Sequence, residues 1–119
     1  MKRLAITVFL GFWLFSGFSQ IKKGDDGLYY DQNNQLYSGE YIEKHENGNH
    51  KLIANFTEGQ KDGKVKLFYK SGELKEIRNY KNGKMHGTWE TWNKNGIKTA
   101  EANYQNNKKH GKWYVWSDT

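Results

Sequence analysis

Glycine recurs along this chain at a fixed interval of 24 residues. The anchoring series is Gly39, Gly63, Gly87 and Gly111, and nine residues after its first three members stand Gly48, Gly72 and Gly96. An interval kept over three and a half units indicates a repeat architecture, in which each unit packs mainly on its neighbours. The expected units lie near 39–62, 63–86 and 87–110, with a partial unit at 111–119 and a degenerate leading hairpin at 27–38.

Aromatic residues recur in step with the glycines. The position two residues after each anchoring glycine holds Tyr41, Val65, Trp89 and Trp113, and the position five residues after it holds Lys44, Phe68, Trp92 and Trp116. Seventeen residues after the first three glycines stand Phe56, Tyr80 and Tyr104, each preceded by asparagine. Runs rich in aromatic and β-branched residues, broken by Asn-Gly or Ser-Gly, predict two strands per unit.

The two kinds of turn in each unit carry different signals. Asn47-Gly48 and its counterparts are expected to form type I′ turns between the two strands, because both residues tolerate positive φ. Asn82-Gly83 marks a turn at the other end of the unit. The anchoring glycines are expected to supply either a positive φ or a close backbone approach beside an aromatic ring.

The predicted fold class is all-β: an antiparallel β-meander of tandem 24-residue hairpin repeats, forming an elongated single sheet. The strands are expected near 40–45, 51–57, 64–70, 74–81, 88–93, 97–105 and 111–116. No segment carries a sustained apolar stripe of period 3.6, so helix should be minor.

The faces of the predicted sheet are only partly defined. In the second strand of each unit, alternation places Phe56, Tyr80 and Tyr104 on one face with Ala54, Arg78 and Ala102. In the first strand the aromatic columns are three residues apart, which strict alternation puts on opposite faces. Either both faces bear aromatic rings or a β-bulge realigns the columns.

Composition limits the core that this chain can build. Beyond residue 19, 30 of 100 residues are apolar and 14 of those are aromatic. The chain has no cysteine, so no disulfide can stabilise it. A thick aliphatic core is therefore excluded, and stability must come from thin aromatic packing and backbone pairing.

Residues 1–19 are predicted to be a signal peptide. A basic start precedes an apolar run over 4–15, and small residues at positions −3 and −1 place cleavage between Ser19 and Gln20. The alternative is a membrane anchor, but twelve apolar residues in a helix span roughly 18 Å against a hydrocarbon core of ~30 Å. We therefore expect a single exported domain over 20–119, periplasmic or secreted, with no integral membrane span after cleavage.

Two surfaces of the predicted sheet are candidate binding sites. The first is a candidate aromatic patch of Trp89, Trp92, Trp113, Tyr114 and Trp116, because so few apolar residues cannot cover both faces of a sheet. The second is a candidate basic rim of Lys61, Lys64, Lys81, Lys84, Lys108, Lys109 and Lys112, in the turns that join successive units. Such a rim could meet anionic lipid headgroups, polyanionic glycans or an acidic protein. The simpler alternatives are ladder packing for the rings and soluble, edge-protecting turns for the lysines.

No constellation in the sequence predicts catalysis, a metal or a cofactor. His86 and His110 occupy equivalent positions, but these are two strands apart, roughly 9–10 Å. Two imidazoles on one zinc ion need nitrogens within about 3.5 Å of each other. No column of carboxylates forms a facing pair at ~5–9 Å. Export argues against nucleic acid as a partner.

The repeats are similar to a known family. Gly87-x-Trp89-x-x-Trp92, followed by Gly96, by Tyr104 and by the next Gly-x-Trp, resembles MORN repeats. The closer resemblance is to the bacterial variant in the YwqK-family "antitoxin" repeat proteins, and it covers 28–119. It implies an array of hairpins that mediates protein–protein contacts and, in some cases, lipid association.

The sequence departs from that repeat pattern at Lys44, Val65 and Asn107, which leaves the Trp-rich end as the most regular surface. The leading hypothesis is an exported, non-enzymatic repeat scaffold that binds a protein partner through an aromatic sheet face. A glycan- or cell-envelope-binding module is the alternative, and the resemblance also implies an antitoxin or immunity role.

Overall fold

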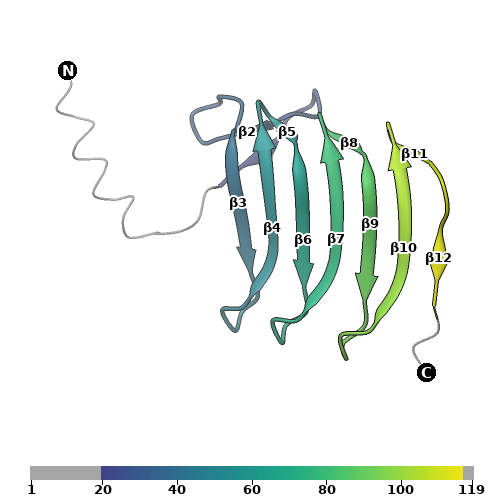
Figure 1. The fold of residues 1–119 in the computed structure, drawn as a ribbon. Helices are drawn as coiled ribbons and strands as arrows, with labels where there is room; N and C mark the ends of the chain where they lie inside the picture. Colours follow the sequence, from purple (N-terminus) through teal and green to yellow (C-terminus); the bar gives the residue numbers. More distant parts are fainter. Residues whose placement is uncertain (1–19, 117–119) are drawn as a thin grey trace, which may run out of the picture.

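The structure, a computed structural model, describes residues 20–116. The predicted signal peptide lies outside the described residues, as do the last three residues of the partial unit. The described part of the chain contains strands and turns and no helix (Figure 1). The predicted all-β class is confirmed.

Six long strands form the main sheet and follow one another side by side in chain order (Figure 1). They are β3 (Gly39–Lys44), β4 (His50–Thr57), β6 (Gly63–Phe68), β7 (Leu74–Lys81), β9 (Gly87–Trp92) and β10 (Lys98–Gln105). Each pairs antiparallel with the next, which confirms the meander. Four two-residue strands complete this sheet: β5 (Gln60–Lys61), β8 (Lys84–Met85), β11 (Lys108–Lys109) and β12 (Tyr114–Val115).

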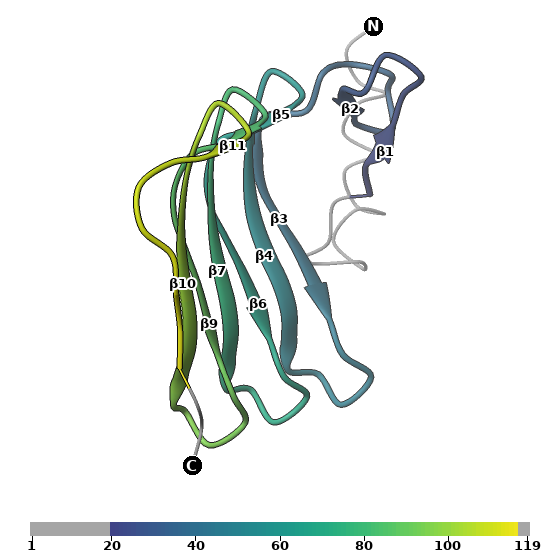
Figure 2. The ribbon, with the colours of Figure 1, turned by 90° about the vertical axis from the view of Figure 1, so that its right-hand side faces the viewer.

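The leading segment differs from the expected hairpin at 27–38. Here β1 (Lys22–Lys23) pairs with β2 (Tyr29–Tyr30) in a separate two-stranded sheet. The expected pairing is present as the bridge between Tyr30 and Leu36, with backbone hydrogen bonds from Tyr37 N to the Tyr29 carbonyl and from Asp31 N to the Gln35 carbonyl. The small sheet stands apart from the long strands, at the end where β5 lies (Figure 2). A backbone hydrogen bond of 2.9 Å from Tyr29 N to the Gly59 carbonyl ties it to the main sheet.

The turn between the two strands of a unit is not the expected type I′ turn. Gly48 N donates to the His45 carbonyl at 2.9 Å, and His45 N donates to the Asn49 carbonyl at 2.8 Å. Gly48 has a φ of 93°, whereas Asn47 is not among the residues with positive φ. This is the three-residue hairpin loop that ends in a left-handed glycine. The Asn47 side chain accepts a hydrogen bond from Asn49 N instead of adopting the left-handed conformation itself.

Type I′ turns lie at the opposite end of the strands, where β4, β7 and β10 fold back into β5, β8 and β11. Both central residues have positive φ in each case: Glu58 (48°) and Gly59 (80°), Asn82 (50°) and Gly83 (81°), and Asn106 (50°) and Asn107 (69°). The second residue of each turn donates its N–H to the preceding unit, at the carbonyls of Tyr37, Lys61 and Met85. These bonds hold the short hairpins together along one end of the sheet (Figure 1).

The anchoring glycine redirects the chain from a short strand into the next long strand. Gly87, the first residue of β9, has a φ of 77°. Direct pairing of β7 with β9 is limited to two residue pairs, Glu76 with Thr91 and Ile77 with Glu90. Nearer the glycine, Asn79 Nδ2 donates to the Thr88 carbonyl at 2.6 Å and so bridges the two strands. The positive φ accounts for the anchoring glycine column, and this bridge, repeated by Asn103 Nδ2 to the Lys112 carbonyl, accounts for asparagine at 79 and 103.

A β-bulge recurs once per unit, and it lies in the second strand. Leu67 pairs with Glu76 and Phe68 with Leu74, so Lys75 is skipped, and Lys51 and Thr99 are skipped in the same way. The first strand alternates without interruption, so Val65 and Phe68 lie on opposite faces. Of the two alternatives left by the sequence, the structure selects aromatic residues on both faces.

Buried side chains concentrate at the N-terminal end of the main sheet. Among apolar residues, Ala54, Phe56 and Val65 retain 2%, 5% and 3% of their accessible surface. The rings of Tyr29 and Tyr37 cover Phe56, with centroid distances of 4.9 and 5.8 Å. Burial of a side chain such as Phe56 contributes about 1.5–3 kcal/mol. In the described residues beyond Val65 no side chain is fully buried, so the sheet is capped at one end only.

The type I′ turns generate a stability prediction. Glu58 occupies a left-handed position that asparagine fills in the next two units. Asparagine tolerates this conformation and glutamate does not, so Glu58→Asn should raise the free energy of unfolding by about 0.5–1 kcal/mol. Denaturant unfolding followed by circular dichroism measures the change. The reciprocal variant Asn82→Glu should lose a similar amount, and equal stability of both variants and wild type would contradict the strain at Glu58.

A second prediction concerns alkaline pH. Burial and the hydrogen bond that Tyr41 donates to Glu43 at 2.8 Å raise the pKa of Tyr41 to about 12. The folded state thus favours the neutral phenol, and this contribution to stability is complete below the unfolded pKa of about 10 and is lost as pH rises toward 12. Tyr41→Phe, which keeps the ring, should therefore flatten the fall in unfolding free energy over that pH range. Tyr114→Phe, at an exposed tyrosine, should not, and an unchanged alkaline slope in Tyr41→Phe would contradict the assignment.

Candidate functional site

Past the leading segment, the sheet face on which Phe56 is buried carries a row of aromatic rings that are partly exposed to solvent. Tyr80, Trp89, Tyr104 and Trp113 follow one another with centroid distances of 5.8, 4.9 and 5.5 Å. The neighbouring planes are tilted by 53°, 51° and 58°. We call these four residues the aromatic row. They come from β7, β9, β10 and the segment before β12, and Trp113 is 41% exposed.

Hydrogen bonds fix the two tryptophans of the aromatic row. Trp89 Nε1 donates to the Asn79 carbonyl at 3.2 Å, and Trp113 Nε1 donates to the Asn103 carbonyl at 3.3 Å. Each indole N–H is satisfied within the fold, as buried or half-buried tryptophan requires. The rings are therefore positioned before any ligand arrives, which lowers the entropy cost of binding.

Cations lie over the rings of the aromatic row. Arg78 Cζ is 5.2 Å from the Trp89 centroid, and Lys109 Nζ is 4.2 Å from the Trp113 centroid. Both distances are within the range of cation–π attraction. Glu76 accepts two hydrogen bonds from Arg78, at 2.7 and 3.3 Å, and these bonds raise the pKa of the guanidinium. The arginine charge is thus balanced by a carboxylate of its own strand.

The structure divides the candidate aromatic patch between the two faces of the sheet. Trp89 and Trp113 belong to the aromatic row. Trp92 pairs with Lys98, whose ammonium binds Glu90 and Glu101 on the opposite face. Tyr114 lies opposite Glu101 and stacks with Trp116 at 5.7 Å and 14°, which places this pair on that opposite face as well. The five rings predicted as one patch therefore form two surfaces.

The lysines of the candidate basic rim share one end of the sheet but not one face. All seven lie in or beside the short hairpins that carry β5, β8 and β11 (Figure 1). Lys61 lies over the Tyr80 ring at 4.9 Å, as Lys109 lies over Trp113. Lys64 points to the other face, where its Nζ is 3.5 Å from Asn79 Oδ1. The lysines of the basic rim thus present positive charge on both faces of the sheet.

The predicted binding residues omitted Tyr80, Tyr104 and Arg78. The sequence had placed all three on one face of the second strands, and the register confirms this assignment. What the sequence lacked was the position of the bulge. Without it, Trp89 and Trp113 could not be assigned to the same face as these tyrosines.

Metal-binding side chains do not converge within residues 20–116: no group of three from His, Cys, Asp and Glu could hold an ion. His86 and His110 mark structural positions, where the backbone N–H of each donates to an asparagine carbonyl of the preceding strand. His45 lies with Nε2 3.0 Å from the Phe68 carbonyl. Over the same residues, no helix has the length and apolar character needed to cross a membrane.

Comparison with known families supports the repeat assignment. Residues 61–82 and 85–106 match the family model described as the MORN repeat variant. Each matched segment runs from a short strand through a hairpin to the next type I′ turn, and the two begin 24 residues apart, which is the interval of the glycine series. MORN repeats are non-enzymatic modules that typically bind proteins or membranes. No curated protein and no solved structure matches the chain significantly.

Proposed function

We propose that this chain is an exported, non-enzymatic scaffold that binds a protein partner through the aromatic row. The observation that carries the proposal is the row itself: four rings in contact and partly exposed to solvent, with both indole N–H groups hydrogen-bonded inside the fold. Tryptophan, tyrosine and arginine dominate the binding energy of protein interfaces. The match to the MORN repeat variant supports the same class of function.

The two ends of the sheet differ in a way that favours the row as the binding surface. At the N-terminal end, Tyr29 and Tyr37 cover Phe56. Further along the same face, Tyr80, Trp89 and Tyr104 remain half-buried and Trp113 is exposed. A partner that supplies the missing cover would bury apolar surface at about 25 cal/mol per Å² without reordering the rings. The face thus continues a packing layer that the chain itself begins.

The test compares two tryptophans of nearly equal exposure on opposite faces. Trp113 is 41% exposed in the aromatic row, and Trp116 is 43% exposed on the other face. The tagged chain is used to recover partners from a cell-envelope fraction, and affinity is then measured with the purified partner. Trp113→Ala should weaken binding by about tenfold or more, the loss of a contact worth about 1.4 kcal/mol.

Trp116→Ala is the matched control and should bind as wild type does. Equal binding by wild type and Trp113→Ala would refute the aromatic row as the site. Recovery of a polysaccharide in place of a stoichiometric protein would refute the protein partner and favour the glycan-binding alternative.

Export is proposed on the leader sequence alone and has its own test. Mass spectrometry of the exported chain should find a mature N-terminus at Gln20. Leu10→Arg interrupts the apolar run over 4–15 and should retain the chain, uncleaved, in the cytoplasm. A wild-type chain found in the cytoplasm with Met1 or its formylated form intact would refute export.

A further inference from the structure

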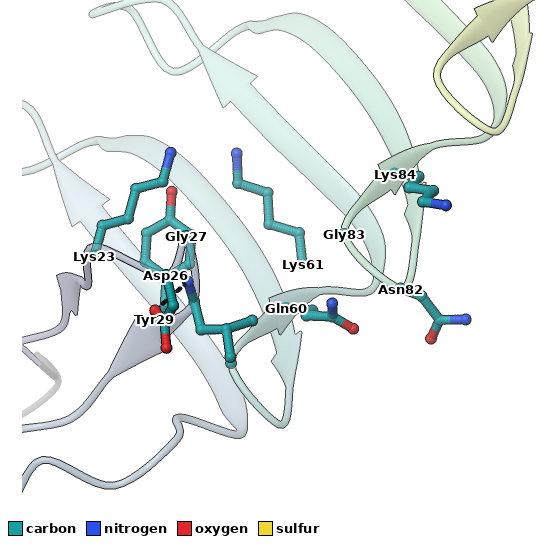
Figure 3. Close-up of a pocket in the computed structure, with 11 residues that line it drawn as sticks. Lys23, Asp26, Gly27, Tyr29, Gln60, Lys61, Asn82, Gly83 and Lys84 are labelled. Atoms are coloured by element: carbon teal, nitrogen blue, oxygen red, sulfur yellow. Dashed lines mark hydrogen bonds between the residues drawn. The ribbon is translucent and has the colours of Figure 1, made fainter.

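A cleft of about 330 Å³ lies between the leading segment and the tips of two type I′ turns (Figure 3). Its walls include Lys23 and Tyr29 on one side and Gly59, Lys61 and Gly83 on the other. The cleft adjoins the aromatic row, because Lys61 lies over the ring of Tyr80, the first member of that row. Neither the match to the MORN repeat variant nor the aromatic row accounts for it.

Two lysines in the cleft have no carboxylate to balance them. Lys23 and Lys61 extend in the same direction beside the Tyr29 ring (Figure 3), with Lys23 Nζ 5.9 Å from its centroid. Among the described residues, neither Lys23 nor Lys61 forms an ion pair. Burial lowers the pKa of Lys61, and the positive charges of Arg78 and Lys23 lower it further. Lys61 is therefore a half-buried cation held beside like charges.

Of the other charged groups at the cleft, Lys84 extends away from Lys23 and Lys61 (Figure 3), and Asp26 and Arg78 have hydrogen-bond partners. Asp26 lines it, but its carboxylate accepts hydrogen bonds from the Tyr30 hydroxyl and from Leu28 N. These two bonds, the Tyr30 bond first, lower the pKa of Asp26. The Arg78 guanidinium is occupied by Glu76. Beside the Tyr29 ring, the positive charge without an ion pair thus belongs to Lys23 and Lys61.

The repeat itself shows that packing does not require a cation at this position. Met85 occupies the position of Lys61 in the next unit, opposite Tyr80 as Lys61 is opposite Phe56. An apolar side chain of similar length is therefore compatible with the short hairpin. Holding Lys61 charged beside Lys23 and Arg78 costs folding free energy, which a bound anion would recover.

We propose that this cleft binds a carboxylate carried by an acidic side chain of the protein partner, with Lys23 and Lys61 as its counter-charges. The proposal rests on the proposed function for the kind of ligand, because a protein seated on the aromatic row would bring its side chains to this cleft. Lysine offers compact point charges, which suit a single carboxylate. A phosphate is better held by the planar guanidinium of an arginine, which donates two parallel hydrogen bonds. The guanidinium near the cleft is that of Arg78, and it already donates to Glu76.

The test uses a short polyglutamate peptide as the probe and titration calorimetry as the measurement. The full chain should bind it, with an affinity that falls as salt is added, and a polyglutamine peptide of the same length should not bind. Lys61→Met and Lys23→Met should each weaken polyglutamate binding by about fivefold or more. The unfolding midpoint of Lys61→Met should equal or exceed that of wild type, which separates loss of the site from loss of the fold.

Lys109→Met is the matched control, since Lys109 also lies over a ring of the aromatic row but far along the sheet from the cleft. It should bind polyglutamate as wild type does. Equal weakening by Lys61→Met and Lys109→Met would show diffuse attraction and overturn the proposal, as would no binding of polyglutamate by wild type. Tighter binding of inorganic phosphate than of polyglutamate, lost in Lys61→Met, would overturn the choice of a carboxylate.

The polyglutamate titration does not use the natural partner, so its result is independent of the binding experiment with Trp113→Ala. If wild type does not bind polyglutamate while Trp113→Ala still weakens the partner complex, the carboxylate site in the cleft is refuted and the aromatic row stands as the partner-binding surface. If polyglutamate binds but Trp113→Ala leaves the partner complex unchanged, the aromatic row is refuted as the partner-binding surface and the carboxylate site stands.

Discussion

Contact between aromatic rings of neighbouring strands is the interaction on which this structure depends. A sheet with so few buried side chains cannot be stabilised by a broad apolar core. Rings that succeed one another at 4.9–5.8 Å from Tyr80 to Trp113 supply packing along the strands instead. Tilted pairs of this kind contribute about 0.5–1.5 kcal/mol each beyond their area burial. Because every contact joins neighbours, stability is distributed along the sheet as a sum of local terms.

The same interaction underlies the proposed function. Rings that stabilise a single sheet must remain exposed on the side that no layer covers, so the packing surface is also the proposed binding surface. The leading segment closes this surface at one end with Tyr29 and Tyr37. At the boundary between the covered and the open parts lies the cleft with Lys23 and Lys61, where charge is left unbalanced. Apolar contact along the row and charge at its covered end would together fix the orientation of a partner.

Repetition lets one unit serve as a control for another. Asn82 shows which residue suits the left-handed position of Glu58, and Met85 shows that the position of Lys61 accepts an uncharged side chain. Differences between equivalent positions therefore identify where a residue serves something other than the repeat. The position of Lys61 differs in this respect from the anchoring glycines, which recur in every unit: it holds lysine again at Lys109 but methionine at Met85.

The sequence by itself determined the meander, the strand pairs and the thin core, because a 24-residue period with glycine at fixed positions permits little else. It also placed Tyr80, Arg78 and Tyr104 on one face, since alternation within one strand is local. Only the tertiary structure decided that Trp89 joins them while Trp92 does not. A bulge that skips Lys75 or Thr99 shifts the register between two strands, but it cannot be recognised from the alternation of residues within either strand. The cleft was likewise beyond the sequence, because it brings together Lys23 and Lys61 from segments that share no repeat position.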